Sequence, residues 1–470
     1  MFAGRAGARP LFLSAEPAHN ERVDASRYAF LPGARPGLTI ASTEGAYLIR
    51  PDGTRILDAS GGAIVASIGH GRREVVEAIA AAAARTTYVV PPFVTPERAA
   101  LVERLQDRWL PAGLRQCVFA SGGSDSVDLA LRIVRQHFVA RGEAERTRVI
   151  GRELSYHGTT LSTLDVGGHT RRKKAFGPEM CTTPKAPACY PLRCDTCAGE
   201  CNLSCADAFE AAFQAAGPGT VAAVILEPIG GSTAGALVPP EGYLRRVVEI
   251  AHRHGALVIA DEVMTGFGRT GARFAVDHWG VVPDVLVGGK GLAAGYAPIG
   301  GVYTTPAVAE PIAAAGDDVM FYTYSAHPMA CAAADQVLSI VEEEGLVERA
   351  AKRGVELGAR LRDAFGDHPN VAEIRGRGLL QAIELVRDRE TLEPFAADDK
   401  LTGVVVATGI ANRAFFYPGG LGGSAGAAAC DVICLGPPFD VTEDQLDQMV
   451  DVLARSVDQA VAHVDARRRG

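Results

Sequence analysis

One lysine and one aspartate stand at the ends of short apolar runs, where a folded chain can bury reactive side chains. Lys290 lies between Gly289 and Gly291, just after the apolar run at 285–288. A lysine at the end of a buried strand can have a lowered pKa and can act as a nucleophile toward a carbonyl carbon. A solvated lysine in a surface loop is the alternative.

Asp261 directly follows the apolar residues 257–260. Burying a carboxylate there is unfavourable unless a cation or hydrogen-bond donors compensate it. A protonated pyridine nitrogen would be such a partner, and the aspartate would keep that ring cationic so that it accepts electrons. A helix N-cap or a metal ligand explains the residue equally well when it is taken alone.

A glycine-rich segment, Ser-Gly-Gly-Ser-Asp at 121–125, joins an apolar run to a helical apolar pattern. The free backbone N–H groups of a helix that begins there would face an anion such as phosphate. The segment matches neither the Walker nor the dinucleotide-binding pattern, so a single phosphate fits it better than a nucleotide. A tight turn without a ligand is the alternative.

Short runs rich in Val and Ile alternate with helical patterns along the middle of the chain. This alternation predicts an α/β core, in which a mostly parallel sheet covered by helices positions the residues named above. Parallel strands present their carboxyl ends at one edge of a sheet, so Glu227, Asp261 and Lys290 are expected to converge on one crevice. We expect a helix over 241–254 and strands over 221–227, 256–263 and 285–288.

The pattern changes beyond about residue 340. A long helix is expected over 346–365, a β-like segment over 374–385 and a closing helix from Thr442. We therefore expect a large domain and a smaller α+β domain that also recruits the N-terminal segment. The expected boundaries are 1–75 for that segment, 76–340 for the large domain and 341–470 for the small one.

The composition of the 470 residues, 47% hydrophobic and 22% charged, is typical of a folded enzyme with two or three domains. A net charge of -8 is no signature of nucleic-acid binding. No apolar stretch has the length of a signal-peptide core or a membrane span. We expect a cytoplasmic protein with neither nucleic-acid nor membrane partners.

Four motifs occur along the chain: Leu-Glu-Pro-Ile at 226–229, Asp-Glu-Val-Met-Thr-Gly-Phe-Gly-Arg-Thr-Gly at 261–271, Gly-Lys-Gly at 289–291 with Gly-Tyr-Ala-Pro at 295–298, and Arg-Gly-Arg-Gly at 375–378. Their order and spacing resemble the class III aminotransferases, which use pyridoxal 5'-phosphate (PLP). The resemblance runs from about Gly45 to near the C-terminus. It implies fold type I: a mostly parallel, seven-stranded type of sheet with helices on both faces, plus a smaller α+β domain.

The resemblance also implies roles for single residues. Lys290 would hold PLP as a Schiff base, and Asp261 would face the ring nitrogen. Val263 and Tyr156 would cover the two faces of the ring. Further cofactor contacts would come from Gly123, Ser124, His157, Glu227, Met264 and, across a subunit interface, Thr323. That last contact implies a homodimer or a dimer of dimers.

Substrate recognition is inferred from one departure from the family pattern. Ser232 stands where γ-aminobutyrate aminotransferase-like members have a glutamate that neutralises the arginine of the Arg-Gly-x-Gly motif. Arg375 is then left to bind a substrate carboxylate, although pairing with another acid is the alternative. Tyr88 and Phe93 are expected in the substrate pocket.

Residues 227–244 resemble the ω-amino acid:pyruvate and amine:pyruvate branch most closely. A ping-pong transfer through Lys290, from an ω-amino acid or primary amine to pyruvate or 2-oxoglutarate, is therefore expected, with pyruvate favoured.

Two other functions are alternatives to this one. Dialkylglycine decarboxylase-like enzymes of the same family also have serine at the position of Ser232. Their pattern has glutamines near Ser60 and at the position of Met264, and the chain lacks both, which disfavours decarboxylation. A non-catalytic PLP-binding protein is the other alternative, and the presence of both Lys290 and Asp261 argues against it.

Half of the ten cysteines gather in one short segment: Cys189, Cys194, Cys197, Cys201 and Cys205. Thiols at such spacings can bind structural Zn²⁺. A loop of reduced or partly buried thiols is the preferred interpretation, and no catalytic metal is expected. The basic residues 171–174 are interpreted as a solvated loop face that could also steer anionic substrates.

Overall fold

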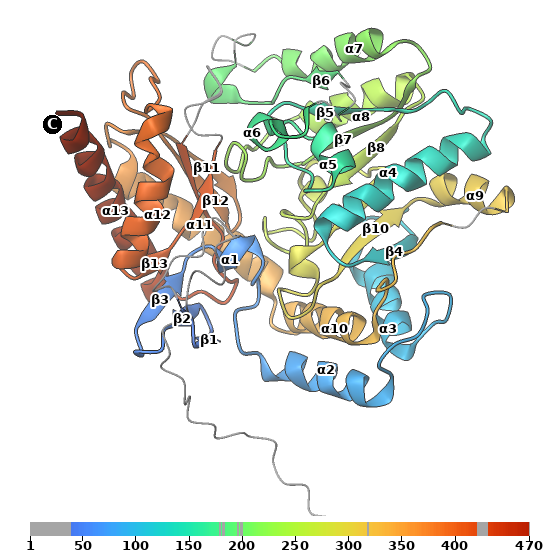
Figure 1. Cartoon of the computed structure of the whole chain (residues 1–470), viewed down its shortest axis with the longest axis horizontal. Coiled ribbons are helices and arrows are strands. Elements are labelled where there is room, and N and C mark those ends of the chain that lie inside the picture. Colours follow the sequence, from blue (N-terminus) through green and yellow to red (C-terminus); the bar gives the residue numbers. More distant parts are fainter. Residues whose placement is uncertain are drawn as a thin grey trace, which may run out of the picture.

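A seven-stranded sheet lies at the centre of the computed structural model, which describes residues 39–177, 180, 184–194, 197, 201–316, 319–420 and 431–469 (Figure 1). Four of its six strand pairings are parallel, and β10 runs antiparallel to both neighbours. The predicted mostly parallel sheet is therefore confirmed. In spatial order its strands are β4 (Gln116–Ala120), β10 (Gly300–Thr304), β9 (Val285–Gly288), β8 (Leu257–Asp261), β7 (Val221–Leu226), β5 (Arg148–Arg152) and β6 (Lys185–Ala186).

Successive strand residues face opposite sides of this sheet and enter two separate hydrophobic cores. Val224 and Val258 pack in one core with residues of α7 (Ser204–Ala216) and α8 (Tyr243–Arg253). Ile225 and Ile259 pack in the other with residues of α4 (Gly123–Ala140). Helices cover both faces of the sheet, so side chains on both faces are buried and apolar. The sequences of these strands are therefore continuous hydrophobic runs.

Further helices surround the sheet. Helix α10 contacts both α2 and α3, and α9 packs on α4. Their bounds are α2 (Arg73–Arg85), α3 (Pro96–Arg104), α5 (Leu161–Val166), α6 (Thr170–Lys173), α9 (Pro306–Ala314) and α10 (Pro328–Glu343), with short turns η2 (Leu105–Trp109), η4 (Pro191–Arg193), η5 (Ala275–Trp279) and η6 (Lys290–Leu292).

The C-terminal part forms a four-stranded antiparallel sheet in the order β11 (Val371–Arg377), β12 (Leu380–Leu385), β15 (Asp431–Leu435) and β14 (Tyr417–Gly419). Its helices are α11 (Leu346–Phe365), α12 (Leu401–Ala411) and α13 (Glu443–Arg469), with the turn η7 (Ala397–Asp399). The expected 374–385 segment is thus a hairpin rather than one strand. Gly378, at φ +55°, makes the turn, where a Cβ would come within 2.3 Å of the Thr270 backbone.

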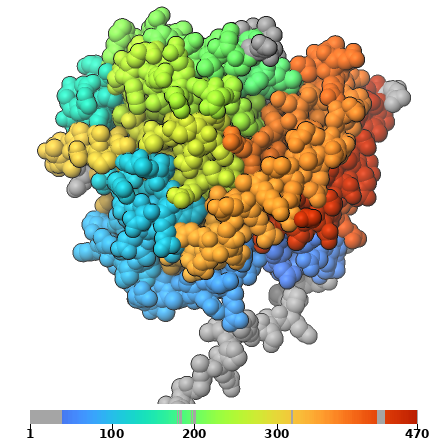
Figure 2. All heavy atoms as spheres, turned by 180° about the vertical axis from the view of Figure 1, so that it is seen from behind, coloured from blue at the N-terminus to red at the C-terminus, as the bar shows by residue number. Residues whose placement is uncertain are grey.

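N-terminal strands complete a third sheet, in which β3 pairs in parallel with β13 from the C-terminal part. In Figure 2 these blue strands lie beside the orange and red C-terminal segments. The domain boundaries stay a prediction, and residues 1–38 of the N-terminal segment lie outside the described residues. No helix of the described part is long and apolar enough to cross a membrane. The strands are β1 (Ser42–Glu44), β2 (Tyr47–Ile49), β3 (Arg55–Asp58) and β13 (Ala414–Phe415), followed by the short helix α1 (Gly61–Ile64).

Candidate active site

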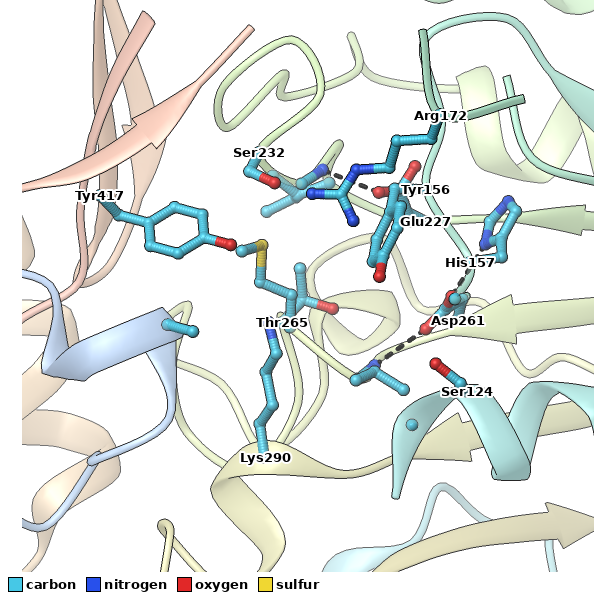
Figure 3. Close-up of a pocket in the computed structure, with 17 residues that line it drawn as sticks. Ser124, Tyr156, His157, Arg172, Glu227, Ser232, Asp261, Thr265, Lys290 and Tyr417 are labelled. Atoms are coloured by element: carbon cyan, nitrogen blue, oxygen red, sulfur yellow. Dashed lines mark hydrogen bonds and ion pairs between the residues drawn. The ribbon is translucent and has the colours of Figure 1, made fainter. Parts of the chain in front are cut away.

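A pocket of about 260 Å³ opens at the carboxyl ends of β7, β8 and β9, the edge at which the sequence analysis places the chemistry (Figure 3). The structure thereby brings Glu227, Asp261 and Lys290 to one cavity. The nine predicted residues that line it are Gly123, Ser124, Tyr156, His157, Glu227, Asp261, Val263, Met264 and Lys290.

Lys290 projects into the space between Tyr417 on one side and Tyr156 and Asp261 on the other (Figure 3). It follows β9, and its backbone has a φ of +40°, a strained conformation for a residue with a Cβ. Burial lowers the pKa of its ammonium group to about 8, which outweighs the opposing attraction of Asp261. Near neutral pH a larger fraction of this amine is therefore neutral, and nucleophilic, than of an ordinary lysine.

Asp261 is 5% exposed and is held in place through both carboxylate oxygens. Its Oδ2 lies 2.8 Å from Nδ1 of His157, and its Oδ1 accepts the backbone N–H of Val263 at 3.1 Å. The His157 ring is buried as well, so it holds the carboxylate in one orientation. The carboxylate can therefore compensate a cation that is brought into the pocket.

The N-terminus of α4 forms one wall of the pocket. Its first N–H groups, from Gly123 onward, have no acceptor within the helix. A Cβ at Gly123 would lie 2.7 Å from Cγ1 of Val263, so only glycine lets the helix end approach this closely. The Ser124 hydroxyl accepts the backbone N–H of Thr159 at 3.2 Å. This wall is suited to a phosphate group.

Glu227 directly follows β7 and lines the pocket. Burial raises the pKa of its carboxyl group against the opposing influence of His157 and Arg152. Oε1 accepts the backbone N–H of Gly231 at 3.0 Å, and Oε2 lies 3.8 Å from the Arg152 guanidinium. Glu227 is thus tied to the loop that carries Gly231 and Ser232.

The mouth of the pocket carries a guanidinium that the sequence analysis did not single out. The Arg172 guanidinium lies 4.6 Å above the centre of the Tyr156 ring and points toward Ser232 (Figure 3). Within the described residues it forms no ion pair. Tyr417 and Ser232 line the same side of the pocket and carry hydroxyl groups. An exposed, unpaired cation next to two hydroxyl groups is a suitable receptor for a carboxylate.

Arg375 lies elsewhere, and the expectation that it is left without an acidic partner is wrong. Its Nη1 lies 2.5 Å from Glu373 and 2.7 Å from Glu384, and its Nε donates to the Gly235 carbonyl oxygen at 2.6 Å. Burial alone would lower the pKa of this guanidinium, but Tyr190 and the two glutamates raise it. The alternative of pairing with another acid is therefore what the structure has.

The cause is the register of the β11–β12 hairpin, which places Glu373 directly opposite Glu384. Two facing carboxylates repel each other unless a cation lies between them, and Arg375 supplies it. Arg375 lines a different cavity, together with Arg377 and Leu237.

Thr323, Tyr88 and Phe93 do not line the pocket in this chain. Thr323 is exposed, as are Tyr88 (43%) and Phe93 (67%). Tyr88 packs edge to face against Tyr324, with ring centres 6.3 Å apart. Their expected roles toward cofactor and substrate stay predictions that require a second subunit.

Comparisons with known proteins agree with this geometry. The family model described as aminotransferase class-III matches residues 32–457. An omega-aminotransferase of Caulobacter vibrioides is 35% identical over 432 residues, which cover 89% of this chain and 93% of the relative. A putrescine–pyruvate aminotransferase of Pseudomonas aeruginosa is 32% identical over 429 residues, covering 90% and 91%.

Solved structures give the same result. An (S)-enantioselective omega-transaminase from Thermomicrobium roseum superimposes with a TM-score of 0.85 at 32% identity, covering 91% of this chain and 93% of that one. The omega-transaminase of Pseudomonas jessenii in complex with PMP has a TM-score of 0.85 at 29% identity, covering 95% and 97%.

Proposed function

This chain belongs to the class-III aminotransferase family, and we propose that it transfers the amino group of an ω-amino acid or primary amine to a keto acid, with pyruvate preferred to 2-oxoglutarate. The observation that carries the proposal is the convergence of the Lys290 amine and the Asp261 carboxylate on one pocket, beside the open end of α4.

The residues present fit PLP, the cofactor of this family. The first turn of α4 offers N–H groups for the phosphate, and the close approach of Gly123 to Val263 leaves them uncovered by a side chain. Asp261 would face the ring nitrogen, with Val263 and Tyr156 on the two faces of the ring. When bound, PLP supplies a carbonyl carbon for the amino group and an electron-poor ring that takes up the electrons released on deprotonation.

The protein's own groups then have separate tasks. Lys290, with its lowered pKa, is the nucleophile that holds the cofactor and afterwards the base that carries a proton at Nζ. The Asp261 carboxylate would stabilise a protonated ring nitrogen, and His157 fixes the orientation of that carboxylate. Amine donor and keto acid use the same pocket in turn, as a ping-pong mechanism requires.

Arg172 replaces Arg375 in our proposal as the group that receives the keto acid's carboxylate. It has no competing carboxylate among the described residues, whereas Arg375 has two. Its exposed position at the mouth also lets an amine donor that lacks a carboxylate enter without leaving a buried guanidinium unpaired. The similarity to the putrescine–pyruvate aminotransferase of Pseudomonas aeruginosa supports pyruvate as acceptor.

We also propose a homodimer, or a dimer of such dimers, located in the cytoplasm. Large apolar side chains are exposed around Thr323, the residue expected to reach the partner's phosphate, and a monomer would leave them in water. They are Tyr88, Phe93, Val94, Met320, Phe321 and Tyr324. Sedimentation at assay concentration is expected to find no active monomer, and a fully active monomer would refute the shared site.

The function is tested by the absorbance of the holoenzyme. Putrescine or β-alanine should remove the absorption band of bound PLP, and pyruvate should restore it while alanine forms. No spectral change with any amine would mean a non-catalytic PLP-binding protein. Release of carbon dioxide from a dialkylglycine, without transfer from simple amines, would mean a decarboxylase.

A further inference from the structure

The five clustered cysteines surround one small cavity that lies apart from the active-site pocket. Its volume is about 20 Å³, enough for a single atom-sized ligand. Each of the five thiols lines it: Cys189, Cys194, Cys197, Cys201 and Cys205. All five are free thiols. Four of these cysteines precede α7, and Cys205 lies in its first turn. The spacing of the cysteines in the sequence does not by itself require that they surround one cavity.

Four of the thiols are neighbours in two pairs, Cys189 with Cys205 and Cys197 with Cys201. Cys197 and Cys205 are also neighbours. Among the described residues no three potential ligands are drawn together around one point. The thiols thus face one small space without forming a closed ligand set.

The two most buried of these thiols come from different parts of the chain. Cys189 lies just before the turn η4, and Cys205 lies in the first turn of α7; each is 4% exposed. The Arg152 guanidinium, at the end of β5, is a neighbour of Cys189. A ligand bound by both thiols would therefore join α7 to the segment that precedes η4.

A second set of contacts supports the loop from outside. The Cys197 thiol donates to Oδ1 of Asn202 at 3.3 Å, and that oxygen also accepts the backbone N–H of Ser204 at 3.0 Å. The Ser204 hydroxyl lies 3.4 Å from the Cys197 sulfur and can donate to it once the thiol has lost its proton, as groups around thiolate ligands do in metal sites. Cys189 and Cys205 are buried in the main core, whereas Cys201 is exposed and leaves a route for an ion to enter.

We propose that Cys189, Cys197, Cys201 and Cys205 bind one structural Zn²⁺ ion, which draws the two thiol pairs into a tetrahedral site. Four soft ligands in two close pairs match the coordination number and ligand preference of zinc. Binding releases the thiol protons, and each thiolate sulfur donates an electron pair to the ion without any change of oxidation state.

The ion would fasten the loop to the rest of the molecule. Tyr190, next to Cys189, donates its hydroxyl to Glu384, and Arg193 pairs with the same carboxylate at 2.8 Å. Glu384 belongs to β12 and also binds Arg375. The loop therefore joins the central sheet to the C-terminal sheet, and zinc would keep this connection in place without contacting the active-site pocket.

The test is the zinc content of untagged holoenzyme, measured by plasma mass spectrometry after growth with added zinc. We expect one zinc per chain in the wild type and in two controls, Cys117→Ser on β4 and Cys194→Ser within the loop. Cys205→Ser and Cys197→Ser should lose most of the metal. Wild-type protein that is fully folded and free of zinc, or Cys205→Ser that keeps it, would overturn the proposal.

A second measurement does not depend on the variants folding. Removing the metal from wild-type holoenzyme with a chelator should expose additional thiols to a thiol reagent and lower the melting temperature. In Cys117→Ser the same shift is expected. A disulfide between Cys189 and Cys205, detected by intact mass in freshly purified protein, would contradict the zinc site and assign the cluster to redox chemistry instead.

Discussion

Replacing Arg172 by methionine separates recognition of a carboxylate from every other contribution to catalysis. Methionine keeps much of the side-chain length and removes the charge. A hydrogen bond to a charged group contributes about 1.5–3 kcal/mol. Arg172 is exposed, so solvent screening reduces this to roughly 1–2 kcal/mol. We expect kcat/KM for pyruvate to fall roughly 5- to 30-fold.

The matched comparison is Arg375→Met, which removes a guanidinium of the same kind from outside the pocket. It would leave buried Glu384 with Arg193 as its remaining cation and would remove the guanidinium that lies between Glu373 and Glu384, and breaking a buried ion pair costs up to about 3–5 kcal/mol of folding stability. Any folded enzyme that remains should use pyruvate and simple amines in unchanged proportion. Loss of Arg172 should therefore impair the use of one substrate, whereas loss of Arg375 should lower the stability of the fold.

Single-turnover spectroscopy of the two half-reactions is the assay. With Arg172→Met, the pyruvate half-reaction should slow while an amine that lacks a carboxylate reacts within about twofold of wild type. The reasoning is refuted if both half-reactions slow equally, or if Arg375→Met alone selectively impairs pyruvate.

Three further predictions concern the cofactor. Asp261→Asn should retain PLP but lose about 10²- to 10³-fold in rate, because a neutral amide does not stabilise a cationic ring; near-normal turnover measured at saturating substrate would contradict this. Gly123→Ala should weaken PLP binding roughly tenfold, because the new Cβ meets Val263 at 2.7 Å; titration of the apoenzyme measures it, and an unchanged Kd would rule out the proposed phosphate wall. Reconstitution of the apoenzyme should accelerate as pH rises and level off above about 8, since only the neutral form of Lys290 attacks PLP. Stopped-flow absorbance measures the rate: a rise that continues without levelling beyond about pH 9 would mean that the pKa of this amine is unshifted, and a flat profile would mean that its protonation does not control the rate.

The central part of the site was predictable because it depends on local patterns. Apolar runs ending at Glu227, Asp261 and Lys290 are parallel strands, and such strands place their last residues along one edge. The glycine-rich start of α4 was predictable for the same reason, since a strand-to-helix turn can be read from a few neighbouring residues.

The environment of Arg375 was not predictable in this way. Its two acidic partners are set by the register of a hairpin and by burial of Glu384, and neither follows from the spacing of the Arg-Gly-Arg-Gly motif. Arg172 was overlooked because it stands in a run of four basic residues, which is typical of a solvated loop. Only the packing of its guanidinium on Tyr156 distinguishes it from its neighbours.

The most direct test of the account is to identify the lysine that carries PLP. Borohydride reduction of the holoenzyme fixes the cofactor to its lysine, and peptide mapping by mass spectrometry then locates the label. We predict a single label, on Lys290. Lys185 on β6 is the matched competitor, because burial lowers the pKa of its amine to about 8 as well. A label on Lys185, or none on Lys290, would contradict the central claim that Lys290 and Asp261 form the active site of a PLP-dependent aminotransferase.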